Sequence, residues 1–226
     1  MKNTITFVVL FLTFSFFSCQ DTKEDSASSH PALAEYKNVG HEIPVETGLQ
    51  WINAYNKKNN TQARIGNLIY GIESDKLENM LSSVDGLTGV AFHYGIDDAG
   101  STHIVAIPIN ETLKVWSSIP GRVFLDTNTG NEITQSEASV WAQRYKDENP
   151  DDLWFHYFGK NVFDEISTIP YFNIIQIVPA IKILDFTPQL LLVIANLDVL
   201  DLGRTSTEQN TKIYDASYPC PPCPVD

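Results

Sequence analysis

The spacing of hydrophobic positions changes several times along the chain, and each change marks an expected element. Residues 5–17 are mostly apolar, and a polar, acidic tract follows them. Beyond residue 43, apolar residues recur every three or four positions in some stretches and at alternate or successive positions in others. The first spacing is typical of helices with one buried face, and the second is typical of strands. The pattern predicts an α+β fold that follows an apolar N-terminal segment.

Two stretches in the two halves of the chain match in residue type, which predicts an internal duplication. "VETGLQWINAYNKKN" and "ITQSEASVWAQRYKDEN" are each expected to form a helix. Trp51 and Tyr55 in the first stretch correspond to Trp141 and Tyr145 in the second, and the i, i+4 spacing places each pair on one helical face.

The start of the second of these helices carries a capping signal. Thr134 is followed three residues later by Glu137. The threonine hydroxyl can accept a hydrogen bond from the Glu137 amide, while the carboxylate accepts from the Thr134 amide. The sequence therefore predicts a helix that begins directly after Thr134.

A shorter helix is expected in each unit after an aromatic-glycine pair. "YGIESDKLENMLSSV" begins at Tyr70 and "FGKNVFDEISTIP" at Phe158, and Ser74 or Asn161 is expected to cap the helix. The amphipathic spacing turns one face toward the core. The side chains expected on that face are Leu77, Leu81, Phe163 and Ile166.

Each unit then ends in two expected strands. "GVAFHYGI" and "THIVAIPI" flank the turn "DDAG", while "IIQIVPAIKIL" and "QLLLVIANL" flank "DFTP", so that Asp97 corresponds to Asp185. "LLLVIANL" predicts a strand buried on both faces, whereas the alternation in "SVDGLTGVAFHYG" predicts a strand that can border solvent. We therefore expect an α+β fold of two related helix-helix-strand-strand units, residues 43–132 and 133–215. Their antiparallel sheets, backed by helices, either merge into one sheet or pack as two layers.

The apolar segment at the start of the chain is expected to be a cleaved signal peptide, residues 1–18. It has a basic residue at Lys2, a mostly apolar run and the small residue Ser18 before Cys19. As a helix, residues 5–17 would span only about 20 Å, short of the ~30 Å hydrocarbon core of a bilayer. A permanent membrane span is therefore not expected.

The boundary "SFFSCQDTKEDS" resembles the lipobox of bacterial lipoproteins, although Phe16 and Phe17 stand where an aliphatic and a small residue are usual. The acidic tract after Cys19 is similar to that of Bacteroidota lipoproteins, in which such residues mark export to the outer face of the outer membrane. The resemblance implies acyl chains such as palmitate on Cys19. It also implies a place at the outer membrane, on the cell surface or the periplasmic face. Residues 19–42 have few large apolar side chains and include "SASSH", which predicts a flexible tether. An ordinary secreted protein is the alternative.

The rest of the chain carries a looser resemblance. The arrangement of "EASVWAQRY", "YFG" and the C-terminal "PCPPCP" resembles uncharacterised lipoproteins and hypothetical proteins of flavobacteria. That family brings no assigned chemistry. The resemblance therefore bears on location and leaves the molecular function open.

Composition limits the partners of the chain. The formal net charge is -13, and removal of residues 1–18 takes away one lysine and no acid, which leaves -14. Such a chain is repelled by nucleic acid, so nucleic acid is not expected as a partner. The expected partners are the membrane, through the acyl chains on Cys19, and other envelope proteins or glycans. Hydrophobic residues make up 43% of the chain, enough to form a core.

Two cysteines remain if Cys19 carries lipid. Cys220 and Cys223 lie in the tail "YPCPPCPVD", within residues 216–226, where we expect a small disulfide. The alternatives are metal capture with ligands from elsewhere and thiol exchange. Pro224 argues against thiol exchange, because it leaves no following helix whose N-terminus could lower a thiol pKa.

An aromatic cluster in "LWFHYFG" has two interpretations. Aromatic faces suit the C–H surface of a sugar, so the cluster could bind a glycan, and the same rings could instead pack a helix against the sheet. We expect packing. The four residues are Trp154, Phe155, Tyr157 and Phe158.

Candidate metal ligands are few. Oxygen-bearing residues alternate around Gly130 as in a calcium loop, but the later glutamate is missing, and a hairpin turn is expected. His93 and His103 lie on the two arms of the first hairpin without a third ligand at fixed spacing. If Tyr94 pairs with His103, the two imidazoles point to opposite faces of the sheet.

No motif for catalysis stands out. The chain has no Gly-x-Ser-x-Gly elbow, no glycine-rich phosphate loop and no His-Glu-x-x-His. We expect no enzyme and no cofactor, but a lipid-anchored envelope protein with a binding or structural role. Thiol redox chemistry or metal capture by the two C-terminal cysteines, and glycan binding by the aromatic cluster, remain as alternatives.

Overall fold

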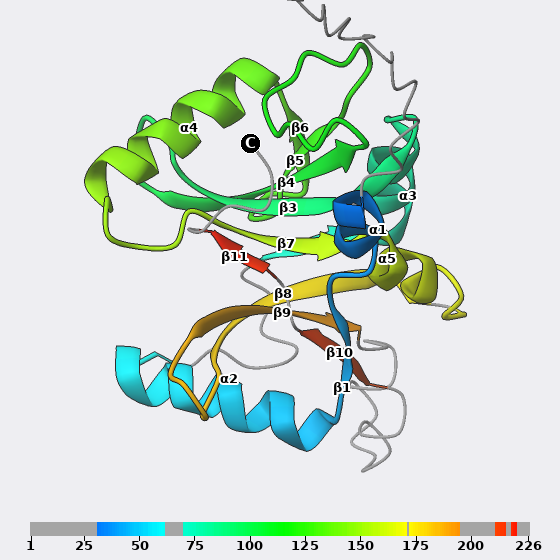
Figure 1. The fold of residues 1–226 in the computed structure, drawn as a ribbon. Helices are drawn as coiled ribbons and strands as arrows, with labels where there is room; N and C mark the ends of the chain where they lie inside the picture. The colour runs from blue at the N-terminus through cyan, green and yellow to red at the C-terminus, as the bar shows by residue number, and fades with distance from the viewer. Residues whose placement is uncertain (1–30, 62–69, 171, 195–210, 216–217, 221–226) are drawn as a thin grey trace, which may run out of the picture.

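The computed structural model describes residues 31–61, 70–170, 172–194, 211–215 and 218–220, which form five helices and eleven strands (Figure 1). The helices are α1 (Pro31–Lys37), α2 (Val45–Asn59), α3 (Ser74–Ser82), α4 (Gln135–Glu148) and α5 (Lys160–Ile166). The strands are β1 (His41–Ile43), β2 (Gly71–Glu73), β3 (Leu87–Ile96), β4 (Thr102–Asn110), β5 (Phe124–Asp126), β6 (Asn131–Ile133), β7 (Phe155–Gly159), β8 (Ile174–Ile181), β9 (Pro188–Ile194), β10 (Lys212–Asp215) and β11 (Tyr218–Cys220). Within this part of the chain, none of the helices has both the length and the apolar character that a membrane span requires.

The strands form two antiparallel sheets that pack face to face. One sheet has the order β1-β10-β9-β8-β2 and the other β11-β7-β3-β4-β5-β6. Side chains from both sheets, among them Phe92, Phe158, Ile177 and Leu192, form the core between them. This confirms the predicted α+β class with helix-backed antiparallel sheets. Of the two sheet arrangements left open by the sequence, the structure has two layers.

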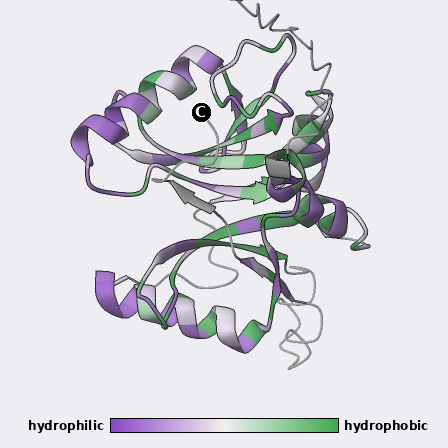
Figure 2. Cartoon of the chain, in the orientation of Figure 1, coloured by the Kyte–Doolittle hydropathy of each residue, from purple (hydrophilic) through white to green (hydrophobic). Residues whose placement is uncertain are grey.

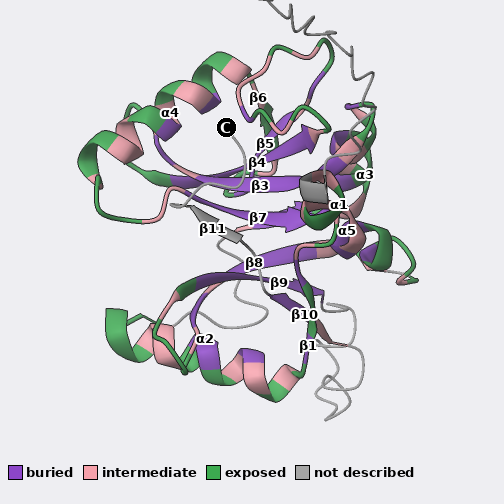
Figure 3. Ribbon diagram, in the orientation of Figure 1, coloured by how far each residue is buried: buried purple, intermediate pink, exposed green. Residues whose placement is uncertain are grey.

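A helix covers the outer face of each sheet, which gives four layers. Trp51 and Ile52 of α2 pack on Leu191 and Val193 of β9, while Ala138 of α4 packs in a separate cluster on the other sheet. Figure 1 shows α4 and α2 on opposite outer sides of the two sheets. Hydrophobic residues lie mainly along the strands (Figure 2), and the buried residues follow the same strands (Figure 3).

The two predicted units are present as the same order of elements, but they exchange parts. The first unit runs α2-β2-α3-β3-β4 and the second α4-β7-α5-β8-β9. Strand β2 pairs with β8 of the second unit, and β7 pairs with β3 of the first. Helix α2 likewise contacts β8, and α4 contacts β3. Each hairpin is therefore completed by the helix and short strand of the other unit.

The structural correspondence of the short strands differs by two residues from the one expected. The aromatic-glycine match equated Gly71 with Gly159. Strand β2 ends at Glu73 directly before α3, whereas β7 ends at Gly159 directly before α5. Gly159 and Glu73 are therefore the structurally equivalent residues, because each is the last residue before the short helix of its unit.

The caps of the two short helices were also expected one or two residues too late. Glu73 precedes α3 and Gly159 precedes α5, and neither makes a side-chain cap hydrogen bond. Ser74 is the first residue of α3, and the side-chain amide of Asn161 donates a hydrogen bond to the carbonyl of Gly40 at 2.8 Å. At Thr134, by contrast, both hydrogen bonds of the capping box are present, so that prediction is confirmed.

Part of the segment expected to be a flexible tether is ordered. Residues 31–37 form α1 and residues 41–43 form β1, which pairs with β10. Tyr36 and Val39 pack against the outer core cluster, and the Gly159 amide donates to the Val39 carbonyl at 2.8 Å. This order could not be predicted from side-chain spacing, because main-chain pairing of β1 with β10 supplies much of the contact.

The two strand-burial predictions had different outcomes. Strand β9 lies between β10 and β8 and is buried on both faces, as expected. Strand β3 was expected to border solvent, but nearly all of its residues are buried. The prediction was wrong because α4 of the other unit covers the outer face of β3.

Candidate functional site

The cysteines expected to carry chemistry lie mostly outside the described residues. This applies to Cys19 and Cys223. The backbone of Cys220 belongs to β11 and lies opposite Phe155 of β7. An extended strand supplies no helix dipole to a thiol, so this placement gives no support to a thiol exchange site.

The predicted aromatic cluster contributes mainly to the core. Phe155, Tyr157 and Phe158 are at most 2% exposed, and Trp154 is half-buried. The Phe158 ring meets Phe92 edge to face at 5.8 Å. Rings buried in this way present no face to a sugar, so the structure supports the packing interpretation.

Two histidines are buried among apolar groups. Burial lowers the pKa of His156 to about 3, and burial together with the nearby charge of Lys146 lowers the pKa of His93 to about 3. His93 lies between the rings of Phe155 and Trp116, at 4.4 and 5.2 Å. Both imidazoles are therefore neutral near pH 7 and are poorly suited to proton transfer there.

His103 lies between two carboxylates. Its Nδ1 is 2.9 Å from Asp126 Oδ1, and its Nε2 is 3.2 Å from Asp97 Oδ2. Gly95 is the residue that pairs with His103 in the sheet, so His93 and His103 share one face, contrary to the register considered from the sequence. Asp97 also accepts hydrogen bonds from two amides of its turn. The contacts connect the β3–β4 turn to β5.

The segment with calcium-like spacing is a hairpin turn between β5 and β6. Asp126 accepts hydrogen bonds from the Asn128 amide and the Thr129 hydroxyl, and Asn128 donates to the Thr102 carbonyl. Glu132 accepts from Asn79 instead. The oxygens thus serve the turn and its neighbours. In the part of the chain that the structure describes, no group of three potential metal-ligating side chains is found.

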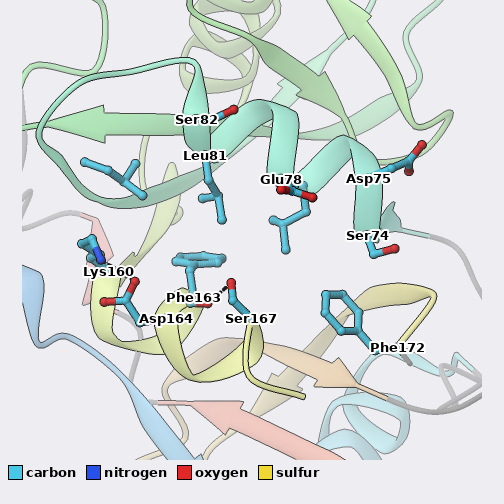
Figure 4. Close-up of a pocket in the computed structure, with 12 residues that line it drawn as sticks. Ser74, Asp75, Glu78, Leu81, Ser82, Lys160, Phe163, Asp164, Ser167 and Phe172 are labelled. Atoms are coloured by element: carbon cyan, nitrogen blue, oxygen red, sulfur yellow. Dashed lines mark hydrogen bonds and ion pairs between the residues drawn. The ribbon is translucent and has the colours of Figure 1, made fainter. Parts of the chain in front are cut away.

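Two of the cavities lined by described residues lie at opposite ends of the sandwich. The larger, of about 620 Å³, opens between α3 and α5, beside Leu87 at the start of β3. We call it the α3–α5 groove (Figure 4). The other, of about 460 Å³, includes Ile96 at the far end of β3 and Pro188 at the start of β9, and we call it the tyrosine pocket.

Both units contribute equivalent positions to the α3–α5 groove. The fourth residue of each helix, Leu77 or Phe163, forms the floor, and the fifth, Glu78 or Asp164, stands at the rim. Figure 4 shows Leu81 and Phe163 pointing into the space between the helices. The groove therefore draws on equivalent positions of the two predicted units.

The groove combines an apolar floor with an acidic rim. Leu77 and Phe163 are buried, whereas Leu81, Leu87 and Phe172 are only half-buried and leave apolar surface open to the groove. Three carboxylates and one ammonium line it, and the ammonium of Lys160 is paired with Asp164. The side chains at the rim are Asp75, Glu78, Lys160 and Asp164.

The tyrosine pocket also draws on both units. Its four tyrosines come from α2, from the residue before β2, from β3 and from α4, and two of them, Tyr94 and Tyr145, stack at 5.2 Å. The sequence singled out the helical pair formed by Tyr55 and Tyr145 but gave no sign that they converge. The four are Tyr55, Tyr70, Tyr94 and Tyr145.

Neither cavity is lined by histidine or cysteine among the described residues. The groups present are aromatic rings, aliphatic side chains, hydroxyls, amides and carboxylates, with a single lysine. Such linings offer apolar contacts and hydrogen-bonding groups to a bound molecule. Comparisons of this chain with protein-family models, with curated proteins and with solved structures found no match.

Proposed function

We propose that the chain is a lipid-anchored protein of the bacterial cell envelope that acts by binding a partner protein in the α3–α5 groove. The acyl chains on Cys19 would provide the anchor, since two or more chains give lasting membrane attachment. Twelve positions separate Cys19 from Pro31, the first described residue. Fully extended, they reach at most about 40 Å, which keeps the folded part close to the bilayer.

The chain joins the folded part at the groove end of the sandwich. The segment after α1 is bonded to the start of α5 through Val39–Gly159 and Gly40–Asn161 contacts. Lys160, which lies between Gly159 and Asn161, lines the groove. An anchored molecule would thus hold the groove within reach of other membrane-bound proteins, which favours an envelope partner.

The observation that carries the proposal is an apolar floor left open between two acidic helices. Removing the half-buried side chains of Leu81 and Phe172 from water lowers the free energy, so a partner that covers them is stabilised on the groove. An apolar groove between helices is a common docking surface for an amphipathic helix. Because the rim carries more carboxylates than ammonium groups, the fitting occupant is an amphipathic segment flanked by lysine or arginine.

A photo-crosslinking amino acid at Leu81, introduced in the native host, tests the groove directly. We expect a covalent adduct whose attached partner peptide, mapped by mass spectrometry, combines apolar residues with basic flanks. Val140 is the matched control, because it is an exposed apolar residue on α4, away from the groove.

Charge reversal supplies a second readout of the same complex. The double variant Glu78→Lys and Asp164→Lys should reduce the yield of the adduct at Leu81 about fivefold to tenfold. Each change replaces a carboxylate that attracts the basic flanks of the partner with an ammonium group. Asp151→Lys, at an exposed site outside the groove, should leave it unchanged. Equal adducts at Leu81 and Val140, or an acidic attached peptide, would refute the proposal.

A further inference from the structure

The tyrosine pocket has the features of an aromatic cage. Four phenol rings line a cavity of about 460 Å³, and Tyr94 stacks on Tyr145 with an interplanar angle of 23°. The four tyrosines are all half-buried, so each ring is held by the protein and still reaches the cavity. Aromatic rings carry negative charge on their faces, which attracts cations placed over them.

The charge carried by the described lining of the pocket is negative. Glu148 is the one charged residue among its described lining residues. Asp152 stands just behind the wall, where its Oδ2 accepts a hydrogen bond from the Tyr145 hydroxyl at 3.3 Å. Burial first and the charge of Asp152 second raise the pKa of both Tyr55 and Tyr145, and only the second of these contributions reflects a negative charge near the rings.

We propose that the tyrosine pocket is a second binding site, separate from the groove, that takes an organic cation of the quaternary ammonium class. Four aromatic rings line the cavity, where they can attract the methyl groups of such a cation, and Glu148 supplies a counter-charge. An anion would meet the Glu148 carboxylate without a cationic partner from the described lining. A bare divalent metal would need several oxygen ligands, and the lining provides one carboxylate.

The pocket's position suits a ligand that arrives from solution. It lies at the ends of β3 and β8 that are far from the groove, where Ile96 and Ala180 belong to its lining. The chain enters the fold beside α5, at the opposite end. A small cation and a protein partner could therefore bind the same molecule at once.

Choline and 3,3-dimethylbutan-1-ol form the decisive pair of probes. They share one shape, but carbon replaces the charged nitrogen in the alcohol. Titration of the purified chain by isothermal calorimetry should show choline binding, with the neutral alcohol at least about tenfold weaker. Equal affinities, or no binding of choline, would overturn the proposal.

Variants assign the binding to the pocket. Tyr145→Leu should weaken choline binding by about tenfold, because it removes one ring of the stacked pair, and Glu148→Gln should weaken it by about threefold to tenfold. Glu78→Gln in the groove is the matched control for the loss of one carboxylate and should change nothing. Near-UV circular dichroism establishes that each variant is folded. Unchanged choline affinity in folded Tyr145→Leu and Glu148→Gln variants would place the cation elsewhere and contradict the proposal.

Discussion

Residues 31–132 and residues 133–226, each expressed alone, are expected to remain unfolded. In the intact chain β7 completes the sheet at β3, and α4 covers its outer face. Residues 31–132 alone would leave buried side chains of β3 such as Val90 and Phe92 exposed, and their own β2 would lack its partner strand β8. An isolated hairpin with uncovered apolar faces has little stability in water.

The measurement is urea unfolding followed by near-UV circular dichroism. Neither fragment alone should give a cooperative transition, whereas an equimolar mixture should recover one, because the exchanged elements then meet their partners. The intact chain, refolded under the same conditions, is the control. A cooperative transition from residues 31–132 alone would show that the first unit is self-sufficient and would contradict the exchange.

Among truncations of single aromatic side chains to alanine, we expect Phe158→Ala to lower the stability of the fold most. Phe158 is fully buried between the two sheets, pairs with Val90 across the β3–β7 junction and meets Phe92 edge to face. Loss of a buried phenyl ring leaves a cavity and lowers the free energy of unfolding by about 3–5 kcal/mol. Chemical denaturation of the purified variant measures the change.

Phe186→Ala is the matched control, because it removes the same ring from a site that is 74% exposed, in the turn between β8 and β9. We expect it to change the free energy of unfolding by no more than about 0.5 kcal/mol. If the two variants were equally stable, the placement of the Phe158 side chain in the core between the two sheets would be wrong.

The sequence predicted the elements whose signals are local. Trp51 and Trp141 are each the seventh residue of their helix, so the match between the two helices was correct. The capping box at Thr134 depends on residues three apart, and it forms as expected. Hydrophobic spacing and caps report on a few neighbouring residues, and here these features were sufficient.

The pairing between units could not be predicted in the same way. Apolar spacing shows that β3 and β8 have buried faces, but not which segment covers them. The glycines at 71 and 159 look equivalent in sequence, yet they occupy different positions relative to α3 and α5. The order of residues 31–43 was missed for a related reason, because β1 is held by pairing with the distant β10.

The two cavities were missed because each combines residues from both halves of the chain. Leu81 packs against the core, as expected, but it is only half-buried and also lines the groove, where it faces α5 of the other unit. Tyr55 and Tyr145 were recognised as equivalents, but their convergence on one pocket follows from the exchange of α2 and α4. The internal sequence match can suggest that two residues are equivalent, but only the packing of the two units shows that their side chains line the same pocket.

The proposed anchor on Cys19 can be tested most directly by mass spectrometry of the protein purified from its own host. We expect the mature chain to begin at Cys19 and to carry the added mass of its acyl chains, and a Cys19→Ala variant should lose both labelled palmitate and membrane attachment. An unmodified thiol at Cys19 in the native protein would contradict the anchored envelope protein proposed above.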